Sequence, residues 1–208
     1  MAKLDVGVLV GLSRDPEPGI RKVADLKLHS CQVSSWNPDD WAEETGEKLR
    51  EACRRHEVRV STFWSGCPGP AVWNFTEGPK TIGLVPPEYR AMRVEALKKA
   101  ADFAAGFQLP SITTHVGFIP EDPNDPKFEG TVEALREVAG HCRKLGIAFC
   151  FETGQETPVT LLRTIERIGL DNLGINLDTG NLILYGKANP VDAIDVFGRS
   201  SSRATRDS

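Results

Sequence analysis

Residues 147–152 read Ile-Ala-Phe-Cys-Phe-Glu, and residues 173–178 read Leu-Gly-Ile-Asn-Leu-Asp. Each stretch is an apolar run that ends in a carboxylate, and a helix-length segment separates the two. If the runs are neighbouring parallel strands, their backbones lie about 4.8 Å apart, and Glu152 and Asp178 leave the sheet at the same carboxyl edge. Two acids placed in this way make half of a metal site.

The same pattern recurs along the whole chain. Short apolar runs rich in β-branched residues alternate with longer segments in which apolar residues return every three or four positions. This alternation is typical of repeated β-α units on a parallel sheet and predicts an α/β fold. The six predicted strands cover residues 4–10, 26–34, 58–64, 111–115, 147–152 and 173–178.

The composition is that of an ordinary globular protein. With 208 residues, of which 40% are hydrophobic, the chain can bury a core as one domain. A net charge of -4 gives no electrostatic reason to expect a nucleic acid or an anionic membrane as partner. The five cysteines are an odd number without C-x-x-C spacing, so we interpret them as reduced thiols of a cytoplasmic protein.

One long connection stands out between the third and fourth predicted strands. Residues 65–87 combine many glycines and prolines with Trp73 and Phe75. A loop of this length after a strand is either a functional lid or disordered. Because it lies on the same sheet edge as Glu152 and Asp178, we favour the lid.

The sequence changes character near its carboxyl end. Residues 191–197 have the pattern of an amphipathic helix, and the polar residues after them offer no side chain to a core. We therefore predict one partial domain over residues 1–198 and a disordered polar tail over residues 199–208. Six β-α units are too few to close an eight-stranded barrel, which typically takes about 250 residues, so we expect a truncated chain.

Glu152 and Asp178 are the strongest candidates for chemistry. A carboxylate directly behind a run of core residues is costly unless it is exposed at the strand end or bound to a cation. The alternative for Glu152 is a solvated loop acid. Asp178 could instead cap the helix that follows it, although one carboxylate can cap and ligate through different oxygens.

Three further residues are candidates for substrate contacts. His115 ends the fourth strand and suits a divalent ion or a substrate hydroxyl, but a histidine there could also be hydrogen-bonded in a core. Glu156 could reach a substrate hydroxyl from the loop, or it could favour the start of the next helix. Trp64, together with Trp36, could form an apolar wall for a sugar ring, or both could be packing residues.

The runs 151–158 and 174–182 resemble the xylose-isomerase-like barrel superfamily of sugar and sugar-phosphate isomerases and epimerases. The resemblance implies an incomplete (β/α)8 TIM barrel. In that family a divalent ion, commonly Mn²⁺, Mg²⁺, Co²⁺ or Zn²⁺, is held by Glu from strand five, Asp from strand six, His from strand seven and Glu from strand eight. Glu152 and Asp178 match the first two ligands, and the last two have no counterpart in this sequence.

The resemblance also implies a reaction in carbohydrate metabolism. A proton is removed next to the carbonyl of an open-chain sugar or sugar phosphate, with Glu152 as one acid-base group. His115, Glu156 and Trp64 would then contact the substrate. Because the second acid-base group of the family, the eighth-strand glutamate, has no counterpart, we expect weak activity or none, and whether the chain is an enzyme stays open.

Two other functions stay open. One is a non-catalytic sugar-binding or interaction module whose unpaired sheet edges are covered by a second copy of the chain. The other is cleavage of abasic DNA, since residues 114–117 are similar to a histidine motif of endonucleases in the same superfamily. Those enzymes have a histidine three residues after the sixth-strand aspartate, where this chain has Asn181. Together with the acidic net charge, this makes DNA cleavage the weaker alternative.

Overall fold

A computed structural model describes residues 5–204 of the chain. The strands are β1 (Gly7–Gly11), β2 (Ser30–Ser35), β3 (Arg59–Ser65), β4 (Ser111–His115), β5 (Ala148–Glu152) and β6 (Leu173–Asn176). The helices are α1 (Glu17–Asp25), α2 (Glu43–His56), α3 (Gly78–Thr81), α4 (Pro87–Gly106), α5 (Pro126–Lys144), α6 (Pro158–Ile168), α7 (Thr179–Leu184) and α8 (Pro190–Ala204), with a short 3₁₀ turn at Pro38–Asp40.

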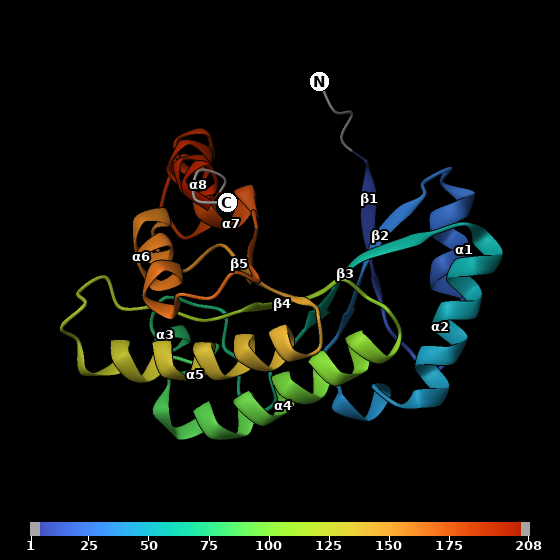
Figure 1. Cartoon of the computed structure of the whole chain (residues 1–208), viewed down its shortest axis with the longest axis horizontal. Helices are drawn as coiled ribbons and strands as arrows, with labels where there is room; N and C mark the ends of the chain where they lie inside the picture. The colour runs from blue at the N-terminus through green and yellow to red at the C-terminus, as the bar shows by residue number, and fades with distance from the viewer. Residues whose placement is uncertain (1–4, 205–208) are drawn as a thin grey trace.

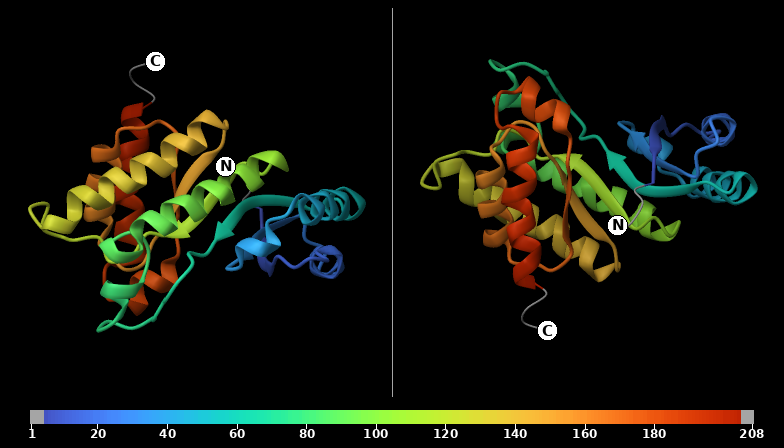
Figure 2. Two further views of the ribbon diagram at one scale, coloured as in Figure 1. Left: turned by 90° about the horizontal axis from the view of Figure 1, so that it is seen from below. Right: turned by 90° about the horizontal axis from the view of Figure 1, so that it is seen from above.

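The strands form one parallel sheet in which sequence order equals spatial order, from β1 to β6. Helices α1 and α2 pack together beside β1 and β2, α4 and α5 run side by side under the middle strands, and α6, α7 and α8 gather at the other end (Figure 1). Figure 2 shows the same grouping from two further directions. The predicted α/β fold of incomplete barrel type is therefore confirmed.

The core lies between the sheet and these helices. Phe63, Ile112, Phe149 and Phe151 point from the strands toward the helices and are fully buried. Because successive strand residues face opposite sides, the intervening residues face the concave inner side of the sheet. Burying one large apolar side chain stabilises the fold by about 1.5–3 kcal/mol, so each residue of this outer layer contributes to the stability of the sheet.

Within residues 5–204, β1 pairs only with β2 and β6 pairs only with β5. The association of these edges with a second copy of the chain stays a prediction. In the same part of the chain, no helix is both long and apolar enough to cross a membrane.

The bounds of every strand except β4 differ from the predicted ones, most of all at the starts of β2 and β1. β2 begins at Ser30 and not at residue 26, because Lys27 has a left-handed φ of 60° and donates a backbone hydrogen bond back to Ala24 at 2.7 Å. This bond closes the preceding helix, so the residue is not available to the sheet. β1 starts at Gly7, and residue 4 of the predicted strand lies outside the described residues.

Residues 199–204 of the predicted tail continue α8. Once the helix has begun at Pro190, each further residue adds a backbone hydrogen bond, and after Gly198 no glycine or proline interrupts it. The rest of the tail, residues 205–208, lies outside the described part of the chain.

The long loop 65–87 is folded around a buried arginine. Arg93 on α4 is fully buried, and its guanidinium donates hydrogen bonds to backbone carbonyls of the loop. The acceptors and distances are Pro68 O at 3.1 Å, Pro70 O at 2.7 Å, Thr81 O at 2.8 Å and Gly83 O at 2.6 Å. A planar guanidinium has enough donors to join four carbonyls, and this arrangement gives a loop poor in regular structure a defined path.

Candidate functional site

The carboxyl edge of the sheet brings three polar side chains into line. His115 on β4 is in register with Glu152 on β5, and Glu152 is in register with Asn176 on β6. Residues at matching positions of neighbouring parallel strands point to the same face, here the concave one. Glu152 and His115 therefore lie together at the edge where the sequence predicted them.

Glu152 is 6% exposed and is held by two donors. Its Oε2 accepts a hydrogen bond from Trp64 Nε1 at 3.2 Å and a second one from Asn176 Nδ2. Burial raises the pKa of Glu152 to about 7, against the lowering effect of these two donors, and the neighbouring Asp178 carboxyl raises it further. Asp178 is hydrogen-bonded through its backbone to Thr153, the residue after Glu152, so the two predicted acids lie close together.

Asp178 does not end a strand, because β6 stops at Asn176 and not at residue 178 as predicted. It is the N-cap of α7, and its Oδ1 accepts from Asn181 N at 2.9 Å. Thr153 Oγ1 bonds both the backbone N–H and the carbonyl of Asp178, at 2.8 and 3.1 Å, which fixes the position of Asp178 next to the end of β5. The capping alternative is thus confirmed, and metal ligation by the same carboxylate stays a prediction.

His115 belongs to the same site. Burial lowers its pKa to about 4, while Gln155 and the charge of Asp178 act in the opposite direction. The imidazole is therefore neutral at physiological pH and suited to hydrogen bonding. Its Nδ1 is buried and has no hydrogen-bond partner among the described residues.

Aromatic rings surround His115. Trp64 and Trp73 pack against it, with ring centroids 5.3 and 4.8 Å from the imidazole, and Trp36 lies 5.1 Å from Trp64. Trp64 is buried and donates its indole N–H to Glu152, whereas Trp36 and Trp73 are 47% and 44% exposed. The faces that could meet a substrate are therefore those of Trp36 and Trp73, and contact between Trp64 and substrate stays a prediction.

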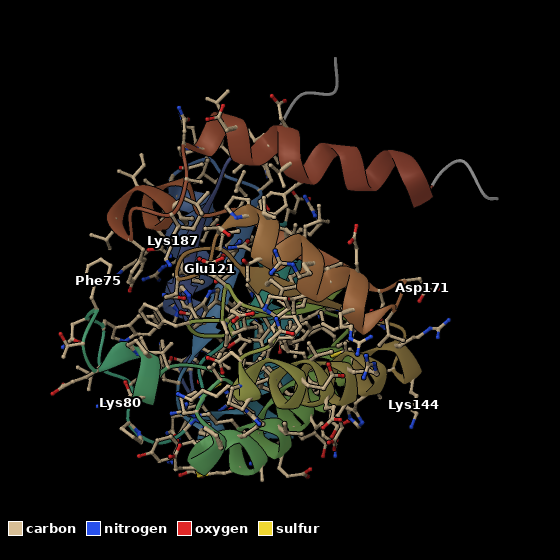
Figure 3. All side chains as sticks on the ribbon, turned by 90° about the vertical axis from the view of Figure 1, so that its left-hand side faces the viewer. Phe75, Lys80, Glu121, Lys144, Asp171 and Lys187 are labelled. Atoms are coloured by element: carbon tan, nitrogen blue, oxygen red, sulfur yellow. The ribbon has the colours of Figure 1, made fainter. Side chains whose placement is uncertain are left out.

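The loop 65–87 spans the site. Trp73 reaches His115 on β4, and Phe75 packs against Tyr185 beyond α7 at 5.4 Å. The loop leaves β3 and thus passes over the carboxyl edge toward the region that follows β6. Phe75 and Lys187 lie at one end of the helices and Lys144 and Asp171 at the other (Figure 3). The loop 65–87 thus lies over the carboxyl edge of the sheet, where a lid over Glu152 and His115 would lie.

Glu156 is 1% exposed, and neither of its carboxyl oxygens has a hydrogen-bond partner among the described residues. Burial raises its pKa to about 8; the charge of Glu121 adds to the increase and that of Lys187 opposes it. Glu121 and Lys187 form an ion pair with Oε1 and Nζ 3.5 Å apart, which Figure 3 labels. Glu156 is therefore a protonated, buried neighbour of the site at neutral pH, and its contact with a substrate stays a prediction.

Glu156→Gln is expected to stabilise the protein at alkaline pH. The pKa of Glu156 is about 8 in the folded state, against 4.5 for an unperturbed glutamate such as that of the unfolded chain. Between these two pH values the unfolded chain has released the proton and the folded chain retains it, so the wild type loses stability as pH rises from about 4.5 to about 8. The amide has no such dependence. The difference in free energy of unfolding between variant and wild type should be small at pH 5 and on the order of 2–4 kcal/mol at pH 9.

Urea unfolding followed by circular dichroism from pH 5 to pH 9 measures this difference. Other titrating groups are common to both proteins and cancel in the comparison. A difference that does not change with pH would show that Glu156 ionises normally in the folded chain.

The residues of the site fit part of a metal-ligand set. Two adjoining carboxylates are suitable for an ion that prefers oxygen, because Mg²⁺ is commonly bound through one or two carboxylates, with waters and substrate as further ligands. The charge of Asp178 adds to the increase in pKa that burial causes at Glu152, and a bound cation would relieve this repulsion. In the part of the chain that the structure describes, no group of three or more His, Cys, Asp or Glu side chains is placed to hold a metal.

Sequence reasoning missed the role of Asn176, and it placed Trp73 in the lid without predicting its contact with His115. Asn176 stands two residues before Asp178, and strand periodicity alone places it on the inner face beside Glu152. For Trp73 no comparable signal exists, because an irregular loop has no periodicity from which the direction of a side chain follows.

The sequence matches the family described as xylose isomerase-like TIM barrel over residues 20–203. The structure of a xylose isomerase domain protein from Planctomyces limnophilus is 32% identical with a TM-score of 0.85, over 94% of this chain and 69% of that protein. A D-psicose 3-epimerase, solved in the presence of D-fructose, is 18% identical with a TM-score of 0.70, over 93% of this chain and 69% of its own.

A xylose isomerase-like TIM barrel protein from Mycobacterium smegmatis, in complex with magnesium, is 16% identical with a TM-score of 0.67, over 92% of this chain and 71% of its own. At such identities the two more distant structures support the fold alone. A comparison with curated proteins found no match. The family match over most of the sequence and the 32% identical structure show that this chain belongs to the xylose isomerase-like TIM barrel family.

Proposed function

We propose that this protein acts on a sugar or sugar phosphate as a divalent-metal-dependent isomerase or epimerase. The observation that carries the proposal is that Glu152, at the end of β5, and Asp178, hydrogen-bonded through its backbone to Thr153, lie close together at the carboxyl edge of the sheet. This edge is where barrels of this kind place their active sites. The epimerase named among the similar structures supports the choice of a ketose as substrate.

Glu152 is the acid-base group in this proposal. A general base works best when its pKa lies near the working pH, and burial brings the pKa of Glu152 to about 7. Its carboxylate removes a proton from the carbon next to the substrate carbonyl, and the electron pair moves onto the carbonyl oxygen. The carboxylic acid then returns the proton to one of the two carbons.

The other residues bind and orient the sugar. Asp178 and Glu152 would hold the cation, Mn²⁺ or Mg²⁺, which supplies electrostatic stabilisation for negative charge on adjacent substrate oxygens. His115 would contact the substrate with its neutral imidazole, and Trp36 and Trp73 offer exposed rings to the apolar face of the sugar. Inversion at carbon uses a second acid-base group on its opposite face, so the minimal reaction expected of Glu152 is hydrogen exchange.

Calorimetric titration with Mn²⁺ tests the metal site. The wild type is expected to bind, and the double variant Glu152→Gln with Asp178→Asn is expected not to bind. Asparagine is chosen at position 178 because it also caps a helix and so preserves the start of α7. Glu133→Gln, an exposed change on α5, is the matched control.

The reaction is tested in D₂O with Mn²⁺ and a panel of ketopentoses, ketohexoses and their phosphates. Proton NMR should show loss of the signal from hydrogen on the carbon next to the carbonyl for at least one sugar. Unchanged Mn²⁺ binding in the double variant, together with no exchange in any sugar, would refute the proposed function.

A further inference from the structure

A hydrogen bond crosses the concave interior of the sheet. Gln32 on β2 donates from Nε2 to Oδ1 of Asn176 on β6 at 2.8 Å. Three strands separate β2 from β6 in the sheet, so the two side chains can meet only across its inner face. Both residues belong to that face, since Asn176 is in register with Glu152.

Asn176 continues this bond to Glu152. Its Nδ2 donates to Glu152 Oε2, which gives a chain of donors from Gln32 through Asn176 to the carboxylate. A carboxylate only accepts hydrogen bonds, so Asn176 must present its NH₂ group to Glu152 and its oxygen to Gln32. Gln32 must in turn present its NH₂ group. The hydrogen bonds among Gln32, Asn176 and Glu152 therefore fix a single orientation for the Gln32 amide and for the Asn176 amide.

The two carboxylate oxygens of Glu152 differ in their hydrogen-bond partners. Oε2 accepts both bonds, one from Asn176 on β6 and one from Trp64 on β3. Two donors that approach from opposite sides of β5 hold Oε2, and neither of them bonds Oε1, the oxygen that we assign to the cation. A ligand whose orientation is fixed before binding does not lose conformational freedom when the ion binds.

We propose that Gln32 and Asn176 are positioning residues that fix the Glu152 carboxylate for cation binding. The inference rests on the proposed function and adds to it a residue outside the carboxyl edge. Gln32 is not a predicted metal ligand, and no other residue of β2 is one. Gln32 acts on the Glu152 carboxylate through the Asn176 amide. Substituting Gln32 should therefore change the affinity for Mn²⁺ without removing any ligand.

Gln32→Glu separates orientation from charge. The new carboxylate is almost isosteric but cannot donate to Asn176 Oδ1, so the Asn176 amide turns its NH₂ group toward residue 32 and its oxygen toward Glu152. The orientation effect weakens cation binding. The added negative charge alone would strengthen it, so the two explanations predict opposite signs.

The experiment is a Mn²⁺ titration of the full chain at pH 7.5, with melting by circular dichroism as a check of folding. Gln32→Glu is expected to raise the Kd at least tenfold, and Gln32→Met, which removes the bond without adding charge, by about two- to fivefold. A purely structural role would lower the melting temperature and leave the Kd unchanged.

Mn²⁺ binding by Gln32→Glu as tight as in the wild type, or tighter, would overturn the inference. If that variant does not fold, a wild-type Kd in Gln32→Met overturns it. The double variant at Glu152 and Asp178, titrated in parallel, separates the two proposals. Loss of binding there with intact binding in the Gln32 variants refutes only the positioning role, whereas intact binding there refutes the proposed function.

Discussion

Arg93→Met is expected to lower the free energy of unfolding by about 3–5 kcal/mol, because it removes one partner of a buried, charged hydrogen-bond cluster. The guanidinium is 0% exposed and joins the carbonyls of Pro68, Pro70, Thr81 and Gly83. Methionine fills much of the same space but offers no donor. The loop carbonyls would then lose their partner, and leaving a buried acceptor unpaired costs about 1–3 kcal/mol.

Urea unfolding followed by circular dichroism measures the change. Lys99→Met is the matched control, since Lys99 lies on the same helix, is exposed and bonds a single carbonyl, that of Pro38, at 3.1 Å. It should alter stability by less than about 0.5 kcal/mol. A loss in Arg93→Met no larger than in the control would mean that the loop folds independently of Arg93.

Arg93 also connects the loop to the site. The loop carries Trp73, which packs on His115, so loosening of residues 65–87 in Arg93→Met should weaken sugar binding as well. Arg93→Lys retains the charge but has a single nitrogen in place of the planar fork, and it should lie between the wild type and Arg93→Met in stability.

Glu152→Gln is expected to reduce hydrogen exchange into the sugar by about 10³-fold even at saturating Mn²⁺, because the amide cannot accept the substrate proton. General acid-base catalysis typically contributes about 10²–10⁴-fold. Asp178→Asn should behave differently. The asparagine retains the cap of α7 and weakens only cation binding, so high Mn²⁺ should restore most of the exchange.

The two variants are compared on the sugar that the wild type exchanges best, by proton NMR in D₂O across a Mn²⁺ series. The expected result is a plateau near the wild-type rate for Asp178→Asn and a flat, low rate for Glu152→Gln. Exchange by Glu152→Gln within tenfold of the wild type would show that another group takes the proton.

Local sequence pattern was enough for the sheet and for the two acids. Strand β4 agrees with its predicted bounds, and β5 differs by a single residue at its start. Glu152 and the end of β6 share one edge because neighbouring parallel strands end there, which requires no knowledge of tertiary contacts, and Asp178 follows two residues after β6. The end of β6 was misplaced because Asp178 terminates the strand by capping a helix, and the sequence allowed both interpretations.

The parts that escaped prediction depend on partners far away in the sequence. Gln32 and Asn176 are 144 residues apart, and no sequence pattern connects them. Arg93 lies next to Val94 on α4, where helical periodicity alone gives no reason to bury a charge. Its burial follows from the carbonyls of an irregular loop, whose path no periodic pattern encodes.

Three of the four tryptophans of this protein, Trp36, Trp64 and Trp73, are packed in one group beside His115 and Glu152, while Trp41 lies in the core against Phe63. Two rings of the group are partly exposed at the sheet edge. Intrinsic fluorescence therefore reports mainly from this one region, and a sugar or cation that enters it should change the emission without any added dye. The chain thus provides an optical signal for ligand screening.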